Sequence, residues 1–247
     1  MKRLLLLAAA LATLACSSGG EQSHSGDAAL IVPEGLAVSA LAGGNGVLDV
    51  IALTLRKGPS STEMYVALRN DGDVPACSAA VSVELFDKTE QPLAAAIGGL
   101  LTQHFYRLTD GSGAIAACVG PGDVTMAALT DLPSEIAVDD VGYVEYRCPY
   151  FALDVVPIDG LTVSRVKRLT SSVGTTYAGK LVNELDVVVT NPSVTVFPVN
   201  RVGRPLGVAN GSGTVEIPPG GSWAFETNSV SEPGVDHVAY PAGALGN

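Results

Sequence analysis

The sequence predicts an all-β protein with two tandem β-sandwich domains behind a signal peptide and a flexible tether. Three observations predict this fold class: apolar residues that alternate along short segments, turn residues about every 8–12 positions, and an internal repeat. Of the 247 residues, 47% are hydrophobic and only 16% are charged. This composition excludes a chain that is disordered throughout.

Residues 1–15 are predicted to be a signal peptide for export. Lys2 and Arg3 precede an apolar run of 12 residues that ends at Ala15. Because a transmembrane helix needs about 20 apolar residues, this run is too short to span a bilayer. Residues 16–46 are then expected to be a tether, since they begin with Ser and Gly and are interrupted by Pro33 and further glycines.

The junction Ala15-Cys16-Ser17 resembles the signal of bacterial lipoproteins, in which the cysteine is diacylated and becomes the mature N-terminus. The resemblance implies a lipid on Cys16, attachment to a membrane through that lipid, and a place in the cell envelope. The non-acidic Ser17 implies sorting to the outer membrane. The sequence departs from the family at Thr13, where leucine is usual. The alternative is ordinary secretion with cleavage after Ala15 and no lipid on Cys16.

The mature chain is strongly acidic. Without Lys2 and Arg3 it keeps 12 basic side chains against 25 acidic ones, a formal charge of −13. Phosphate affinity comes mainly from Lys and Arg, so this charge argues against nucleic acid as a partner. Anionic lipid would also repel the chain as a whole, so membrane attachment must be covalent or hydrophobic.

An internal repeat sets the domain boundaries. Shifted by 113 positions, residues 48–96 align with 161–209 without a gap and share 12 identities, among them Asn70 with Asn183. The repeat then predicts that Gly111-Ser112-Gly113 matches Gly211-Ser212-Gly213, and that 130–143 matches 227–240. We expect one domain over residues 47–148, a linker over 149–160 and a second domain over 161–247.

The first copy carries an insertion, predicted over residues 97–109, that contains Phe105 and Tyr106. An insertion in one of two equivalent modules is a candidate for a copy-specific contact, so Phe105 and Tyr106 are candidate binding residues. The alternative is a lengthened strand or hairpin that packs on its own module.

Each copy is predicted to consist of strands. Met64, Val66 and Leu68 alternate with other residues, a pattern typical of a strand with one buried face. About seven such strands in about 100 residues indicate an immunoglobulin-like sandwich. A barrel is the alternative.

The segment NDGDVPACSAAVSVELFDKTEQPL, residues 70–93, precedes a Pro-Gly turn and an apolar strand. It resembles the small bacterial FxLYD-type sandwich domains, and Val83, Leu85, Phe86 and Asp87 carry the match. The second copy departs, with Phe-Pro-Val-Asn at 197–200. The resemblance implies an envelope-facing module and supplies no known catalytic residues to carry over.

Motifs for catalysis or metal binding are missing from the sequence. His24, His104 and His237 form no closely spaced pair, and no GxSxG or nucleotide-binding glycine motif occurs. The acidic segment 70–73 offers oxygen ligands for calcium, but tight turns select the same residues, and we favour the turn. We expect no catalytic residue, metal or cofactor. Trp223, the single tryptophan, is expected in the core.

Three cysteines follow in the exported chain, where disulfides can form. In immunoglobulin strand order, Cys77 begins the third strand at one end of the sandwich, whereas Cys118 and Cys148 end strands at the opposite end. The sequence therefore predicts a Cys118–Cys148 disulfide and Cys77 as a buried free thiol.

Two functions from different classes are consistent with the sequence. The first is a non-catalytic, envelope-anchored lipoprotein that uses its two modules for binding, adhesion or spacing, with an envelope protein or glycan as partner. The alternative is an exported hydrolase-type enzyme whose site comes from residues distant in the sequence. A pocket with convergent polar groups would favour the enzyme, and a filled sandwich would favour the binding module.

Overall fold

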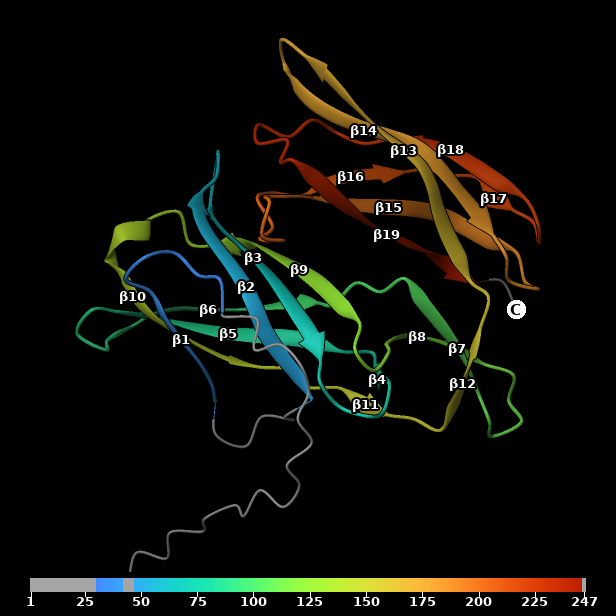
Figure 1. Ribbon diagram of the computed structural model, residues 1–247, viewed down its shortest axis with the longest axis horizontal. Helices are drawn as coiled ribbons and strands as arrows, with labels where there is room; N and C mark the ends of the chain where they lie inside the picture. The colour runs from blue at the N-terminus through green and yellow to red at the C-terminus, as the bar shows by residue number, and fades with distance from the viewer. Residues whose placement is uncertain (1–29, 42–46, 246–247) are drawn as a thin grey trace, which may run out of the picture.

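The computed structural model describes residues 30–41 and 47–245 (Figure 1). The predicted signal peptide, Cys16 and residues 17–29 and 42–46 of the predicted tether lie outside the described residues. Residues 30–41 of that tether are described, and Ala37–Ala40 form a strand, β1, that pairs in parallel with residues 143–146. This part of the expected tether is therefore part of the first module. The described chain is almost entirely β, apart from one 3-10 turn at Val138–Asp140. No helix within 30–41 and 47–245 is long and apolar enough to cross a membrane.

Two sheets enclose the core of the first module. One has the order β2-β3-β9, from β2 (Leu48–Lys57), β3 (Thr62–Asn70) and β9 (Val124–Leu132). The other has the order β1-β10-β5-β6, from β1 (Ala37–Ala40), β10 (Val141–Arg147), β5 (Ala80–Asp87) and β6 (Pro92–Gly99). Buried Leu, Val and Met side chains from both sheets, among them Met64, Leu68 and Leu85, form one cluster. This arrangement is a β-sandwich.

The second module repeats this strand order. Its sheets are β13-β14-β18 and β19-β15-β16, the second with β17 paired to β15. The strands are β13 (Leu161–Ser171), β14 (Gly174–Asn183), β15 (Val189–Val199), β16 (Ala209–Ser212), β17 (Glu216–Ile217), β18 (Ser222–Glu226) and β19 (Asp236–Leu245). A second cluster of buried residues, including Tyr177, Leu181 and Val196, fills the space between them.

Strand register follows the shift of 113 residues up to the end of β6. Leu48 pairs with Asn70 as Leu161 pairs with Asn183, and Ala80 pairs with Gly99 as Ser193 pairs with Ser212. Residues 97–99 therefore belong to β6, and the extra residues of the first copy lie between Gly99 and Cys118. The expected match of the two Gly-Ser-Gly segments is wrong, because 111–113 form the turn between β7 (His104–Leu108) and β8 (Ile115–Val119), whereas Ser212 ends β16.

The predicted match of 130–143 with 227–240 also fails at its last strand. Tyr143 pairs with Phe86, whereas Tyr240 pairs with Thr195, whose counterpart in the first module is Ser82. The two tyrosines therefore occupy positions four residues apart along equivalent strands. Their identity in the alignment does not reflect an equivalent place in the fold.

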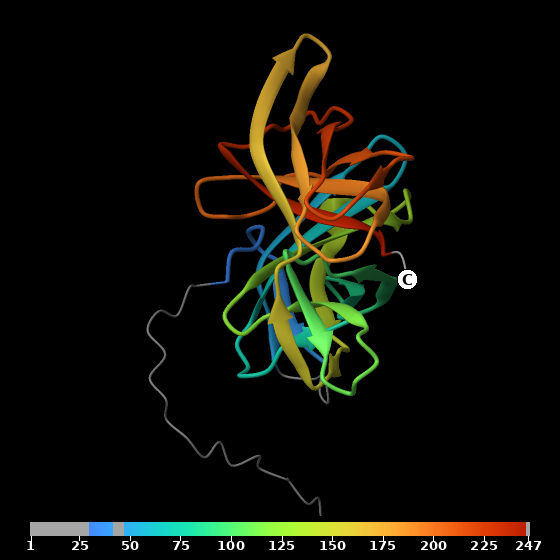
Figure 2. The same cartoon turned by 90° about the vertical axis from the view of Figure 1, so that its right-hand side faces the viewer.

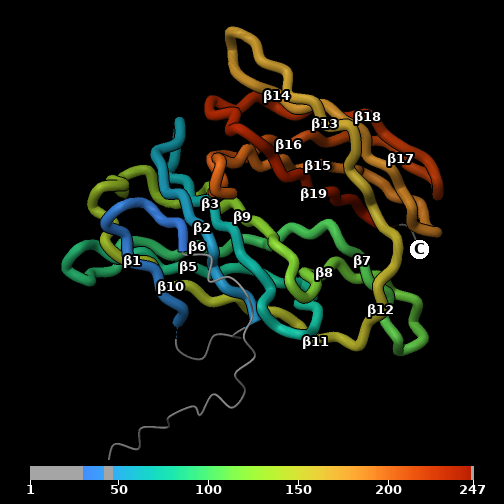
Figure 3. The backbone as a smooth tube through the Cα atoms, viewed as in Figure 1, coloured from blue at the N-terminus to red at the C-terminus, as the bar shows by residue number. Residues whose placement is uncertain are grey.

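A third, small sheet connects the modules. Its order is β11-β4-β8-β7-β12, from β11 (Phe151–Ala152), β4 (Ala76–Cys77), β8 (Ile115–Val119), β7 (His104–Leu108) and β12 (Val155–Ile158). Both β11 and β12 lie in the segment 149–160 that was expected to be a linker. In this segment β11 pairs with β4 and β12 pairs with β7, both strands of the first module. The chain then continues into β13 (Figure 3).

The β2-β3-β9 sheet is buried on both faces. In β3 every residue from Met64 to Leu68 is 0–1% exposed, whereas the alternating pattern predicts one buried face. The outer face of the sheet carries Tyr65 and Met126, which join a cluster with Phe197 and Tyr240 of the second module. The second module therefore packs on this sheet and removes its outer face from water.

Candidate functional site

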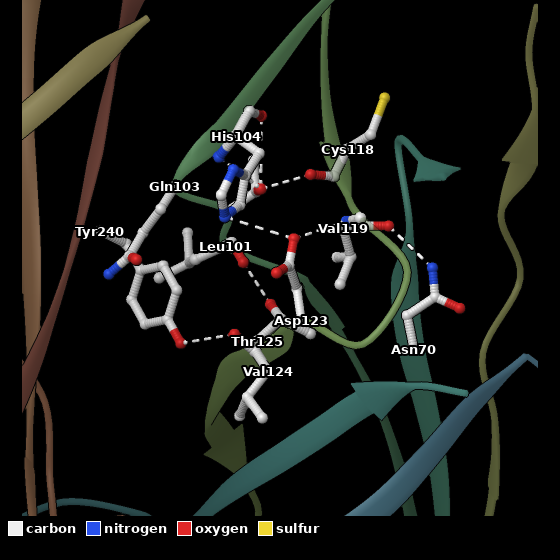
Figure 4. A network of polar contacts seen from close by, with 12 residues as sticks. Asn70, Leu101, Gln103, His104, Cys118, Val119, Asp123, Val124, Thr125 and Tyr240 are labelled. Atoms are coloured by element: carbon white, nitrogen blue, oxygen red, sulfur yellow. Dashed lines mark hydrogen bonds and ion pairs between the residues drawn. The ribbon is translucent and has the colours of Figure 1, made fainter. Parts of the chain in front are cut away.

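A group of polar contacts marks the place where the insertion meets the second module (Figure 4). His104 begins β7, and Asp123 lies in the turn before β9. The Nε2 atom of His104 is 3.3 Å from Oδ2 of Asp123, and the same oxygen accepts a hydrogen bond of 3.0 Å from the Gly120 N–H. The pair is partly open to solvent, with side-chain exposures of 53% for His104 and 32% for Asp123.

A cavity of about 260 Å³ lies beside this pair. Its lining comes from the insertion (101–104), from Val119 at the end of β8, from residues 123–125 and from Val238 of the second module. Two contacts span the junction here: Gln103 Nε2 donates to the Ala239 carbonyl at 2.8 Å, and the Tyr240 hydroxyl donates to the Val124 carbonyl at 3.4 Å. The cavity is therefore part of the contact between the modules.

Both threonine hydroxyl groups in the cavity lining donate hydrogen bonds to backbone carbonyls. Thr102 donates to the Cys118 carbonyl, and Thr125 donates to the Leu101 carbonyl. In the part of the chain that the structure describes, no hydroxyl or thiol is hydrogen-bonded to the His104 ring. The arrangement can hold a polar group at its rim, but it does not show the contact between a nucleophile and a base that nucleophilic catalysis uses.

Phe105 and Tyr106, the candidate binding residues, are both buried, at 7% and 8% exposure. Phe105 lies in the core cluster of the second module beside Leu161, although it belongs to the insertion of the first. Tyr106 packs on the opposite face of β7, over Cys77 and Cys118. Burial and the nearby Asp123 raise the pKa of Tyr106. Phe105 and Tyr106 of the insertion therefore contact other parts of the same chain.

The disulfide joins Cys77 to Cys118, which corrects the predicted Cys118–Cys148 bond. Residues 76–77 form a separate short strand, β4, in which Cys77 lies directly opposite Cys118 of β8 at a Cα–Cα distance of 4.0 Å. The prediction failed because it placed Cys77 at the start of the third strand. Cys148 is instead the free, buried thiol, and burial together with Asp49 raises its pKa to about 12.

The turn that begins at Asn70 has a structural role. The buried Asn70 side chain donates from Nδ2 to the carbonyls of Val74 and Val119, both at 2.9 Å, and its Oδ1 accepts from the Gly72 N–H. Its amide thus ties the turn to β8. Among residues 30–41 and 47–245 no group of three or more His, Cys, Asp or Glu side chains is placed to hold a metal ion.

Asn183 makes the same three contacts in the second module. Its Nδ2 donates to the carbonyls of Val187 and Ile217 at 2.9 and 2.8 Å, and its Oδ1 accepts from the Leu185 N–H. Both asparagines are fully buried. Because the second turn has Leu185 where the first has Gly72, the buried amide is what the two turns share.

Trp223 and His237 each lie beside another aromatic ring. Trp223 is half-buried at the edge of the second core, 6.1 Å from the Phe225 ring centroid. The His237 ring lies 5.3 Å from that of Tyr177. A second, open cavity of about 510 Å³ lies near Arg107, whose Nη2 donates to both carboxylate oxygens of Asp186 at 2.9 Å. His24 lies outside the described residues.

Comparisons with known proteins assign no family. No family model matches the chain, and no curated protein matches its sequence. A crystal structure of transglutaminase from red sea bream is similar over 81% of this chain, at 10% identity and a TM-score of 0.25, and the chain spans 29% of that protein's length. A TM-score this low supports no inference about fold or activity.

Proposed function

We propose that the chain is an envelope-anchored lipoprotein whose two immunoglobulin-like, FxLYD-type modules form one rigid, non-catalytic unit for binding, adhesion or spacing. The observation that carries this proposal is the docking of the second module on the β2-β3-β9 sheet. A flexible tandem would leave that sheet face in water, whereas here it lies in a shared apolar cluster with Phe197 and Tyr240.

Polar contacts at the rim of this docking surface support the rigidity. Arg56 donates from Nη1 to the Leu206 carbonyl at 2.8 Å and from Nε to Glu63 at 2.9 Å. Its guanidinium also lies 5.0 Å from the centroid of the Tyr65 ring. Charge-assisted bonds of this kind are stronger than neutral ones and fix an orientation. They hold the turn after β15 against the first module.

The connection between the modules supports the same proposal. A linker in coil conformation lets two domains move independently. Here β12 pairs with β7 through residues 155–158, and the chain then enters β13 after two residues. A rigid unit suits a spacer or an adhesin, because it presents its far end at a constant distance from its attachment. An envelope protein or a glycan is the proposed partner.

The anchor is tested at Cys16. The wild-type protein and a Cys16→Ser variant are compared by membrane fractionation and by the mass of the N-terminal peptide, with Cys148→Ala as the matched cysteine control. We expect diacylglycerol on Cys16 of the wild type, membrane association of the wild type and of Cys148→Ala, and release of Cys16→Ser. An unmodified N-terminal peptide in the wild type would show that the chain is not a lipoprotein.

The rigid unit is tested with spin labels on Cys replacements of Lys88 in the first module and Val202 in the second. The background carries Cys16→Ser and Cys148→Ala, so that only these two thiols react. We expect one narrow distribution of label-to-label distances. A broad distribution would mean that the modules move independently and would contradict the role as a rigid spacer.

A further inference from the structure

The β13–β14 hairpin, residues 161–183, projects from the second module beyond the rest of the molecule (Figures 1 and 2). Its tip, residues 170–175, lies past the point where β14 pairs with β18, which ends at Ala178. Thr175 forms one bridge to Val230, and beyond it the two strands have only each other as ladder partners. The hairpin thus reaches into solvent.

The hairpin is basic in an acidic protein. Residues 161–183 contain Arg165, Lys167, Arg168 and Lys180 and no Asp or Glu. Among the described residues none of these four side chains forms an ion pair, whereas Arg56, Arg69, Arg107 and Arg147 each pair with a carboxylate. The hairpin cations are therefore not neutralised by close contacts.

Carboxylates also lie along the hairpin. Glu184 accepts a hydrogen bond from Thr162 at the base, and Glu226 accepts one from Thr176, which pairs with Leu169 near the tip. Arg168 donates to the carbonyl of Gly234, in the loop that carries Glu232 and precedes Asp236. At physiological salt the screening length is about 8 Å, so these carboxylates offset part of the charge of the hairpin, whereas the more distant acidic residues act on it little.

Two apolar side chains are exposed at and beside the tip, whose sequence is Thr-Ser-Ser-Val-Gly-Thr. Val173 is 84% exposed and Leu169 is 46% exposed. The backbone beside them is largely satisfied within the hairpin, because Thr170 pairs with Thr175, Ser171 pairs with Gly174, and the Val173 N–H is bonded to the Ser171 hydroxyl. A tip whose polar groups are paired internally can leave water at a low cost.

The equivalent hairpin of the first module differs in each respect. Its tip, residues 57–62, reads Lys-Gly-Pro-Ser-Ser-Thr and has no large apolar side chain. Ser61 and Thr62 hold it against the chain, donating to the carbonyls of Thr130 and Ile136. The exposed Val173 and Leu169, with cations behind them, are thus specific to the second copy.

From this we propose that the β13–β14 hairpin binds the surface of an anionic phospholipid membrane, with Val173 and Leu169 at the interface and Arg165, Lys167 and Arg168 among the headgroups. Exposed apolar side chains beside Lys and Arg are the combination that interfacial membrane binding uses. A soluble polyanion would be bound by the cations alone and would leave Val173 without a role. This contact does not depend on the proposed lipid anchor.

The test uses the chain from residue 16 with Cys16→Ser, which cannot carry the proposed lipid. Its sedimentation is measured with vesicles of phosphatidylglycerol and phosphatidylcholine, and with vesicles of phosphatidylcholine alone. We expect binding to the anionic vesicles only. Each basic side chain near an anionic surface contributes a factor of about five, so Arg165→Gln/Lys167→Gln/Arg168→Gln is expected to weaken binding about a hundred-fold.

Matched controls separate the hairpin from charge in general. Lys88→Gln/Arg147→Gln/Arg201→Gln makes the same change in net charge elsewhere and is expected to bind as before. Val173→Asp is expected to lose about ten-fold or more, whereas Val202→Asp, at a residue 59% exposed in another turn, changes little. Circular dichroism confirms folding of each variant.

Three results would overturn the proposal. The first is a wild-type chain that binds neither vesicle, or binds both equally. The second is an equal loss from both triple substitutions, which would mean that overall charge and not the hairpin determines binding. The third is an unchanged affinity of Val173→Asp together with equally tight binding to dextran sulfate, which would identify a polyanion site in place of a bilayer contact.

Discussion

Phe105, from the insertion of the first module, packs over the Cα atom of Gly160, the residue that immediately precedes β13. A Cβ atom at position 160 would overlap the Phe105 ring. The ring is 7% exposed and is held in the core of the second module, so it has no free space to move into. The pair therefore fixes where the chain enters the second module.

Gly160→Ala is expected to destabilise the protein by about 1–3 kcal/mol, the usual cost of forcing extra volume into a packed site. Gly99→Ala is the matched control, because no atom lies within 4 Å of its Cβ position. Urea unfolding measures both. A double-mutant cycle with Phe105→Leu should show that the two sites are coupled. Equal, small effects at both glycines would contradict the packing.

The disulfide gives a second prediction. A peptide map under non-reducing conditions should link Cys77 to Cys118 and leave Cys148 free. The bond closes a loop with a sequence separation of 41, so Cys77→Ala/Cys118→Ala is expected to lose about 4 kcal/mol of unfolding free energy in the chain-entropy model. Cys148→Ala, the control, should cost about 1 kcal/mol. A linked peptide containing Cys148 would contradict the structure.

Cys148 should be unreactive in the folded protein. The residue is 2% exposed, and burial with the nearby Asp49 raises the pKa of its thiol to about 12, so the nucleophilic thiolate is scarce at pH 8. We expect a thiol reagent to label it only after denaturation, in a Cys16→Ser chain. A Val173→Cys replacement on Cys148→Ala provides an exposed thiol that reacts at once. Rapid labelling of native Cys148 would contradict its burial.

The two buried asparagines should matter equally. Asn70→Ala and Asn183→Ala each remove an amide that satisfies two carbonyls and one N–H, and each is expected to cost about 3 kcal/mol of unfolding free energy. Asn210→Ala, at an exposed amide, should cost well under 1 kcal/mol. A loss at one asparagine alone would show that the two turns are not equivalent.

The contribution of Asp49 to the free energy of unfolding should fall as pH rises. Partial desolvation and the nearby Asp71 raise its pKa above the ordinary 3.8, although Tyr146 and Arg69 oppose them. The folded state therefore favours the protonated carboxyl, so the stability from this group is greatest below pH 3.8 and is lost as pH rises through the folded pKa. We expect Asp49→Asn to be more stable than wild type at pH 7, a difference that disappears toward pH 3. Chemical unfolding at several pH values measures this.

Local patterns in the sequence predicted the parts of the fold that depend on neighbouring residues. Asn70 and Asn183 align in the repeat and make the same contacts. The repeat could predict this because each turn needs a side-chain amide to bond to its own backbone. The all-β class followed from alternation and turn residues in the same way. The insertion boundaries were misplaced, because a repeated Gly-Ser-Gly is a common turn composition and does not determine a register.

The contacts between the modules could not be predicted from local patterns. Tyr65 and Met126 look like the exposed positions of half-buried strands, and only the second module shows that their face is covered. Cys77 was assigned to the wrong end of the sandwich because a two-residue strand leaves no periodic signal. The contact of His104 with Asp123 depends on where the insertion folds back, and neither residue belongs to a motif.

The β2-β3-β9 sheet contributes side chains to two apolar clusters, one on each face, and this decides how the chain can be divided for expression. Cutting this chain after residue 148 would leave Tyr65, Ala67 and Met126 facing water and would also cut away β12, the partner of β7. We therefore expect the two modules to be stable only when they are expressed as one chain.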